Sequence, residues 1–234
     1  MGMQFIDICT NIVRRLLPQN CLLCDAYCGQ QQLCTGCLRD LPAHDFPCCP
    51  VCAMPSPQAE MCGACIKHPP CFDATLAAFT YAFPIDALLR TLKYQGQLSI
   101  AELAGESLAQ SIVGRSFPDL LVPMPLHPQR LKERGFNQAT EIARIVSRRT
   151  GIPLASDVVL RVRETEPQAS LPLAKRSKNM RGAFACRQEM SGKHIALVDD
   201  VMTSGASLNE LAKTLKTVGA GRVECWVAAR TLRG

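Results

Sequence analysis

The chain has 234 residues, of which 47% are hydrophobic and 20% are charged, so it can bury a core and is not a disordered chain. Its net charge is +6, and the positive excess falls in residues 72–234, which indicates an anionic partner. No apolar run approaches the ~20 residues needed to cross a bilayer, and no basic leader precedes an apolar block. We therefore expect a soluble, cytoplasmic protein with no membrane partner.

The first 18 residues carry apolar side chains at helical spacing, which predicts an amphipathic helix. The cysteine content then rises sharply and falls again, which predicts a division of the chain into three segments. These are an N-terminal helix at 1–18, a cysteine-rich domain at 19–71 and a larger domain at 72–234.

Twelve of the 14 cysteines lie in the first 71 residues, and eight of them form four CxxC pairs in two copies that are 28 residues apart. The eight are Cys21, Cys24, Cys34, Cys37, Cys49, Cys52, Cys62 and Cys65. A CxxC turn presents two thiolates to one face of a metal ion, and zinc binds four ligands in a tetrahedron. Because about 50 residues bury too little apolar surface to fold alone, we predict two structural zinc sites here.

A disulfide cluster or redox-active pairs are the alternative, and the duplicated four-ligand spacing favours zinc. The spacing leaves the pairing open: one zinc per repeat, or a cross-braced arrangement of the first pair with the third and the second with the fourth. Four cysteines fall outside the repeat and are not expected to bind metal, namely Cys9, Cys28, Cys48 and Cys71. A closed four-cysteine site has no position for a substrate, so it serves structure or docking.

From about Asp73 the cysteines stop, and apolar strands alternate with amphipathic helices. This alternation predicts an α/β domain with a mostly parallel sheet flanked by helices. The predicted strands are 76–82, 119–122, 158–162, 193–198 and 222–229, and the predicted helices are 84–94, 98–113, 128–150 and 205–218.

The most informative stretch is 193–210. Residues 195–198 are wholly apolar, as in a strand buried on both faces, and Asp199 and Asp200 follow at its carboxyl end, where open α/β sheets bind ligands. Small hydroxylated residues and Gly205 then open a helix whose N-terminus attracts an anion. The order predicts a sugar phosphate site, with the loop holding the phosphate and the acids holding ribose hydroxyls. The alternative is a solvated strand end followed by an N-cap.

Two further segments are candidates for this site. Pro123-Met124-Pro125 forms a rigid turn after an earlier strand, and Arg130 and Arg134 offer guanidinium groups suited to pyrophosphate. A stiff strand exit and a solvated helix face are the alternatives. The polar, cationic stretch 163–183 predicts a loop that closes over a charged substrate, or else a plain connector.

The segment ALVDDVMTSGAS resembles the phosphoribosyl pyrophosphate (PRPP) motif of type I phosphoribosyltransferases. This resemblance implies that Asp199 and Asp200 bind the ribose 2′- and 3′-hydroxyls and that Mg²⁺ bridges the pyrophosphate and the sugar. It implies contact with the pyrophosphate for Pro123, Met124 and Pro125. The 5′-phosphate would be wrapped by Val201, Met202, Thr203, Ser204, Gly205, Ala206 and Ser207.

Two more segments, LVPMPLHPQRLKERGFNQA (121–139) and RVRETEPQASLPLAKRSKNMRGAF (161–184), are similar to the ComF family of competence-associated proteins. The family combines a cysteine-rich zinc domain, here a double zinc ribbon, with a type I phosphoribosyltransferase-like domain. Its most recognisable element, RGFNQ, spans residues 134–138. The resemblance implies a link to DNA uptake, with single-stranded DNA and a competence helicase or other uptake proteins as partners.

Two functions follow. The first is a phosphoribosyltransferase with an unidentified nitrogen acceptor, in which Asp199, Asp200 and Arg134 are catalytic. The second is a non-enzymatic module that senses PRPP or binds single-stranded DNA. The intact acid pair favours PRPP binding, and an aromatic content of 5% weakens a stacking platform for single strands.

Overall fold

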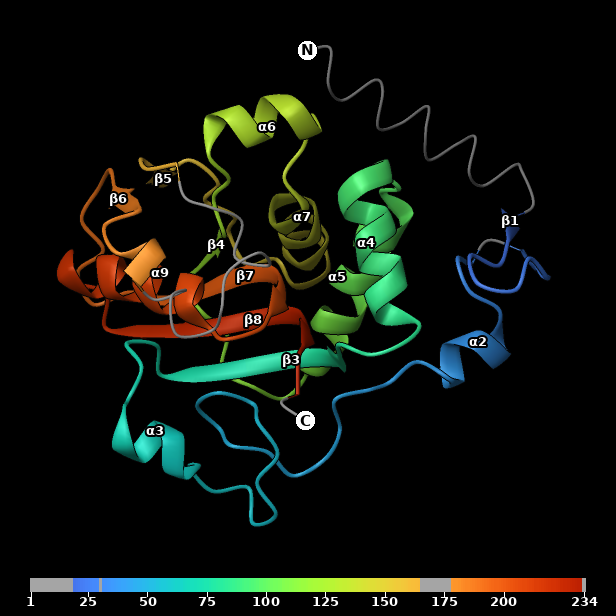
Figure 1. Ribbon diagram of the computed structural model, residues 1–234, viewed down its shortest axis with the longest axis horizontal. Helices are drawn as coiled ribbons and strands as arrows, with labels where there is room; N and C mark the ends of the chain where they lie inside the picture. Colours follow the sequence, from blue (N-terminus) through green and yellow to red (C-terminus); the bar gives the residue numbers. More distant parts are fainter. Residues whose placement is uncertain (1–18, 30, 165–177, 233–234) are drawn as a thin grey trace. The chain divides into compact units, whose positions relative to one another are not determined.

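The computed structural model describes residues 19–29, 31–164 and 178–232. The predicted helix at 1–18 and most of the predicted loop at 163–183 lie outside these residues. The chain divides into two compact units, one ending at Pro42 and the other running from Ala43 to the C-terminus (Figure 1). The predicted boundaries at 18/19 and 71/72 remain predictions.

The first unit contains a short antiparallel pair of strands, β1 (Gln19–Asn20) and β2 (Tyr27–Gly29), and one turn of helix, α2 (Thr35–Arg39). The Cys34 side chain caps α2 by accepting a hydrogen bond from the Cys37 N–H. Among the described residues of this unit, few apolar side chains are buried, namely Cys21, Leu33 and Leu41. Such a small core fits a unit whose fold depends on a metal.

The second unit is built on a four-stranded sheet in the order β3-β8-β7-β4, in which every neighbouring pair is parallel. Its strands are β3 (Ala74–Thr80), β4 (Leu120–Pro123), β7 (His194–Met202) and β8 (Arg222–Arg230). The predicted parallel α/β sheet is confirmed. Residues 195–198 of the inner strand β7 are completely buried, because helices cover both faces of a sheet of this kind.

The helices of the second unit are α3 (Gly63–Lys67), α4 (Ile85–Gln95), α5 (Ser99–Ser111), α6 (Pro128–Arg134), α7 (Gln138–Thr150) and α9 (Ala206–Thr217). Helices α5 and α7 pack together over one face of the sheet, and α9 lies over the face nearer the viewer in Figure 1. Gly105 permits the close contact of α5 with α7, since a Cβ there would lie 2.5 Å from the Ile145 Cβ. A small antiparallel pair joins β5 (Val159–Arg161) to β6 (Phe184–Cys186).

Three details differ from the sequence predictions. The single helix predicted at 128–150 is two helices, because Gly135 ends α6 in the left-handed conformation (φ 80°) and Asn137 caps α7. The strand predicted at 193–198 continues to Met202, so Asp199 and Asp200 lie inside the carboxyl-terminal part of β7. Strand β6 has no counterpart among the predicted elements.

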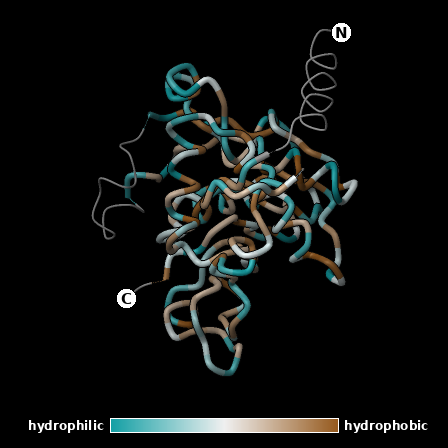
Figure 2. The backbone as a smooth tube through the Cα atoms, turned by 90° about the vertical axis from the view of Figure 1, so that its right-hand side faces the viewer, coloured by the Kyte–Doolittle hydropathy of each residue, from teal (hydrophilic) through white to brown (hydrophobic). Residues whose placement is uncertain are grey.

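Hydrophobic and hydrophilic stretches alternate along the chain, as amphipathic helices and buried strands require (Figure 2). Within the described residues, no helix has both the length and the apolar character needed to cross a membrane.

Candidate functional site

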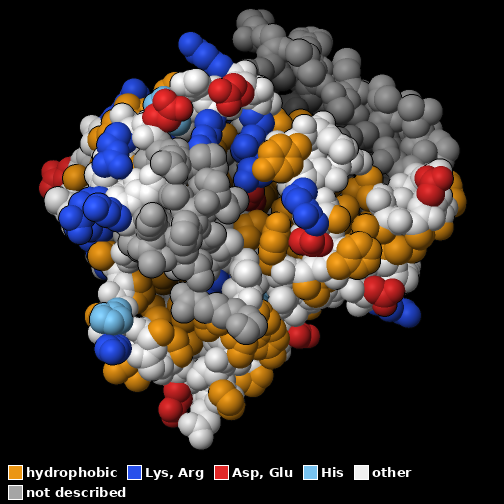
Figure 3. Space-filling model, viewed as in Figure 1, with side chains coloured by type: hydrophobic (Ala, Val, Ile, Leu, Met, Phe, Trp, Pro, Cys, Tyr) orange, Lys and Arg blue, Asp and Glu red, His pale blue; other side chains and the backbone are white. Residues whose placement is uncertain are grey.

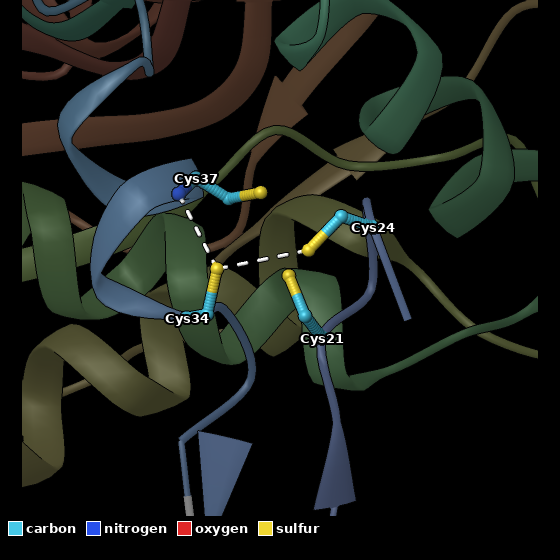
Figure 4. Close-up of side chains that lie close together, drawn as sticks. All are labelled: Cys21, Cys24, Cys34 and Cys37. Atoms are coloured by element: carbon cyan, nitrogen blue, oxygen red, sulfur yellow. Dashed lines mark hydrogen bonds between the residues drawn. The ribbon is translucent and has the colours of Figure 1, made fainter. Parts of the chain in front are cut away.

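The eight predicted cysteines form two tetrads, and in each the four sulfur atoms lie within 4.8 Å of one another. Cys21, Cys24, Cys34 and Cys37 form the first tetrad (Figure 4), and Cys49, Cys52, Cys62 and Cys65 form the second. Consecutive CxxC pairs therefore combine, which resolves the pairing in favour of one site per repeat. The cross-braced alternative is wrong.

Sulfur–sulfur distances in both tetrads fit a tetrahedral zinc ion. Cys24 Sγ lies 3.7 Å from Cys34 Sγ, and Cys52 Sγ lies 3.6 Å from Cys62 Sγ. Four ligands at a Zn–S distance of ~2.3 Å are separated by ~3.8 Å, whereas a disulfide bond measures ~2.05 Å. The two tetrads thus fit structural zinc.

The 28-residue sequence repeat is also a structural repeat. The N–H of Cys21 donates to the Ala26 carbonyl and the N–H of Cys49 donates to the Met54 carbonyl, both at 2.8 Å. The residue after each first CxxC pair, Asp25 or Ala53, adopts a left-handed conformation, with φ of 59° and 55°. Each repeat therefore builds its metal site with the same backbone turn.

At one cysteine of each tetrad, backbone N–H groups favour the thiolate form in which cysteine binds zinc, whereas the pKa is raised at Cys24, Cys37, Cys52 and Cys65. Burial raises the pKa of Cys49, but hydrogen bonds from the N–H groups of Cys62, Cys52 and Val51 outweigh burial and lower that pKa to about 7. In the first tetrad, a similar balance of burial against backbone N–H groups lowers the pKa of Cys21 to about 6.

The surroundings of the tetrads differ. Cys24 of the first tetrad is exposed. In the second tetrad, Cys49 is completely buried and Cys65 is nearly so, and both belong to the hydrophobic core that includes Met202 and Leu208 of the sheet domain. The second site is thus part of the domain core.

A cavity of about 1180 Å³ opens at the carboxyl ends of β4 and β7. Most of the predicted sugar phosphate residues line it, namely Asp199, Asp200, Arg134, Met124, Val201, Met202, Thr203, Ser204, Gly205 and Ser207. The remaining three, Pro123, Pro125 and Ala206, are not among its lining residues. The structure therefore brings together the acid pair, the loop before α9 and the turn after β4.

The two carboxylates lie side by side on β7. The Asp200 N–H donates to Asp199 Oδ1 and the Val201 N–H donates to Asp200 Oδ1, each at 2.9 Å. Burial and the neighbouring Asp200 carboxylate raise the pKa of Asp199 well above its usual value. The pair presents closely spaced carboxyl oxygens to the cavity as acceptors for hydroxyl groups, and a bound cation would favour their charged form.

Gln138 is a site residue that the motif search did not assign. It is 4% exposed, its Nε2 donates to Asp200 Oδ2 at 3.4 Å, and its Oε1 accepts from Arg134 Nη1 at 2.7 Å. The RGFNQ segment thus connects Arg134 to the acid pair. Asn137 caps α7 and donates to the Met124 carbonyl at 2.9 Å, which holds the turn after β4. The only sequence signal for Gln138 was its place in that polar segment.

Cationic side chains from several elements also line the cavity, namely Arg90, Lys93, Arg130, Arg134 and Arg161. Three of them were not predicted: Arg90 and Lys93 on the polar side of α4, and Arg161 on β5. On the face shown in Figure 3, Lys and Arg side chains gather in the upper half of the view. Together with the acid pair, these cations suit a polyanion that arrives with a divalent metal.

We expect the full chain to bind two zinc ions. Cys34→Ser and Cys62→Ser should each lower the zinc content to about one per chain, because each removes one ligand from one tetrahedron. Elemental analysis by mass spectrometry measures this content. Cys28 lies outside both tetrads, so Cys28→Ser is the matched control and should keep two zinc ions per chain. Loss of both ions from either ligand variant would contradict two independent sites.

We expect Asp199→Asn to stabilise the fold at high pH. The folded chain keeps a proton on Asp199 up to a higher pH than the unfolded chain does, so the free energy of unfolding falls as pH rises above about 4. The substitution removes this cost, so it should raise the free energy of unfolding at about pH 8 and change it little at about pH 4.

Urea unfolding at both pH values measures the difference. Asp157→Asn, at an exposed carboxylate, is the control and should change neither value. An Asp199→Asn variant no more stable than the parent chain at about pH 8 would show that the buried charge is not costly.

Two family models match the chain: the double zinc ribbon domain at residues 12–66 and the phosphoribosyl transferase domain at residues 132–234. The chain is 32% identical over 225 residues to DNA utilization protein YhgH of Escherichia coli K12, covering 92% of this chain and 99% of the relative. It is 31% identical over 222 residues to competence protein F of Haemophilus influenzae, covering 90% and 96%.

Among solved structures, the glutamine PRPP amidotransferase of Bacillus subtilis aligns with 54% of this chain and 25% of its own, at 20% identity and a TM-score of 0.38, which is too distant to add to the assignment. The relatives match the chain over nearly their full length, one family model covers both tetrads, and the other covers the sheet domain from residue 132 onward. The chain therefore belongs to the ComF family, whose members join a double zinc ribbon to a phosphoribosyltransferase domain.

Proposed function

We propose that this protein binds PRPP together with Mg²⁺ in the cavity at the carboxyl ends of β4 and β7, and that it transfers the 5-phosphoribosyl group to a nitrogen acceptor. One observation carries the proposal: the adjacent carboxylates of Asp199 and Asp200 share this cavity with a glycine-containing loop that opens a helix. A ribose 5-phosphate needs both: hydrogen-bond acceptors for its hydroxyl groups at one end, and hydrogen-bond donors for its phosphate at the other.

The 5′-phosphate would bind the phosphate loop, which we define as residues 203–207. Gly205 has φ 76°, and α9 begins at the next residue and runs for 12 residues. Its N-terminal N–H groups and its dipole favour a phosphate at this end. Asp199 and Asp200 would accept hydrogen bonds from the ribose 2′- and 3′-hydroxyls, with Gln138 orienting Asp200.

Arg134 would bind the pyrophosphate. Its guanidinium is half-buried and held by Gln138, so it enters the cavity in one orientation. Burial lowers the pKa of Arg134, but an arginine remains charged in any ordinary environment. Mg²⁺, when bound with PRPP, would supply further neutralisation of the leaving group.

In the transfer step, the bond from ribose C1 to the pyrophosphate oxygen breaks, a bond from C1 to the acceptor nitrogen forms, and the acceptor loses a proton. Positive charge develops on the ribose as the pyrophosphate leaves. The protein's part is to hold the sugar at Asp199 and Asp200, stabilise the departing anion at Arg134 and keep water from C1.

Titration calorimetry with Mg²⁺–PRPP tests the proposal. We expect saturable binding by the full chain and no measurable binding by the double variant Asp199→Asn/Asp200→Asn, because amides remove both charged acceptors. Asp157→Asn should bind as the parent chain does. Absence of heat with the folded parent chain would overturn the proposal, and equal binding by the double variant would move the sugar site elsewhere.

We further propose that this activity serves DNA utilization or competence, the processes that the names of the relatives YhgH and competence protein F give. The cationic lining of the cavity supports an alternative function as a module that binds single-stranded DNA. In that case a labelled oligonucleotide should bind at low salt, and its affinity should fall steeply as salt rises. Absence of binding at low salt, or an affinity that does not change with salt concentration, would exclude this alternative.

A further inference from the structure

Arg230 lies between the second cysteine tetrad and the phosphate loop. It is the last residue of β8 and only 2% exposed. Its Nε donates to the Cys52 carbonyl at 2.8 Å, while its Nη1 donates to the Met202 carbonyl at 2.8 Å and to the Thr203 carbonyl. One buried guanidinium therefore binds both the backbone of a zinc ligand and the backbone at the start of the phosphate loop.

On the loop side, these hydrogen bonds fix peptide planes. A peptide unit is planar and trans, so its carbonyl and its N–H point in opposite directions. The Met202 carbonyl shares a peptide unit with the Thr203 N–H, and the Thr203 carbonyl shares one with the Ser204 N–H. By binding both carbonyls, Arg230 directs both N–H groups away from itself, and Thr203 and Ser204 both line the cavity.

On the zinc side, three consecutive carbonyls of one CxxC turn dock on the sheet. The Pro50 carbonyl accepts from the Thr75 N–H at 3.1 Å, the Val51 carbonyl accepts from Thr75 Oγ1 at 2.6 Å, and the Cys52 carbonyl accepts from Arg230. A metal that binds Cys49 and Cys52 sets the shape of this turn. The position of the carbonyl that Arg230 contacts thus depends on the metal.

We propose that Arg230 is a positioning residue that couples the second zinc site to the phosphate loop. Zinc at the second tetrad keeps the loop in the conformation that binds a phosphoribosyl ligand, and the ligand in turn strengthens zinc retention at that tetrad, because thermodynamic coupling is reciprocal. The identity of the ligand in this inference rests on the proposed function. The conformational link between the second tetrad and the phosphate loop is independent of that function.

Amide hydrogen exchange in the full chain tests the link without any ligand. Cys62→Ser, which breaks the second tetrad, should accelerate exchange in a peptide covering 202–208, and Cys34→Ser, which breaks the first, should leave it unchanged. In an Arg230→Met background, the loop should already exchange rapidly, and Cys62→Ser should add nothing. Unchanged loop exchange in Cys62→Ser, or an equal effect with and without Arg230, would overturn the proposal.

Three further measurements separate positioning from general damage. Exchange at 195–198 in the buried centre of β7 reports whether a variant has lost its fold. Arg230→Lys keeps the charge without the forked donors, and should loosen the loop even if Arg230→Met does not fold. Thr75→Val removes the hydrogen bond to the Val51 carbonyl and a 3.9 Å contact with Met202 Sδ, but none to the loop carbonyls, and should leave loop exchange near that of the parent chain. A loop loosened equally by Thr75→Val would overturn a specific role for Arg230.

The ligand arm uses Mg²⁺–PRPP. Arg230→Lys should retain two zinc ions and bind PRPP about tenfold more weakly than the parent chain. In the parent chain, PRPP should slow zinc transfer from the second tetrad to a chromogenic chelator, while the first tetrad serves as the internal control. If the parent chain binds no PRPP, the proposed function fails, and hydrogen exchange still decides the link between tetrad and loop.

Discussion

The inner strand β7 sets the arrangement on which the rest of the protein depends. Its apolar centre is buried on both faces, so the sheet holds it rigidly between β8 and β4. The same strand continues beyond its apolar run and places Asp199 and Asp200 at the edge of the cavity. Two carboxylates at the end of a rigid strand have little freedom to move apart, and burial together with the neighbouring Asp200 charge raises the pKa of Asp199. The folded protein thus holds a carboxyl group whose ionisation is unfavourable at the place where the proposed ligand binds.

Around this strand, polar side chains connect elements that are distant in sequence. Gln138 at the start of α7 joins Arg134 to Asp200, and Arg230 at the end of β8 joins Cys52 to the loop before α9. Both side chains are almost completely buried, and a buried polar group must satisfy its hydrogen bonds within the protein. Their partners are therefore held at fixed positions, which is the property that a preorganised site needs.

Much of this was predictable from sequence because the signals are local. Zinc imposes a short spacing on its ligands, so the CxxC repeat predicted the eight cysteines of the tetrads while leaving their pairing open. The apolar run with two acids and a helix start predicted residues that line the cavity. The break in the helix predicted at 128–150 depends on a single left-handed glycine, whose neighbours match a helical pattern on both sides. Gln138 and Arg230 were not predicted, because their hydrogen-bond partners lie on other elements. The spacing of apolar residues in the sequence does not indicate such contacts. The cations of α4 were missed for the same reason.

The division of the chain at Pro42 and Ala43 makes the two copies of the duplicated ribbon unequal. The described residues that line the cavity, and the carbonyls of Cys52, Met202 and Thr203 that accept hydrogen bonds from Arg230, belong to the unit that begins at Ala43. The first ribbon could be exchanged for another module, or lost, without removing a side chain from the domain core. The second could not, because Cys49, Val51 and Cys65 are part of that core. A substitution in the second copy therefore has to satisfy the packing of the sheet domain, a constraint that the described residues of the first copy do not share.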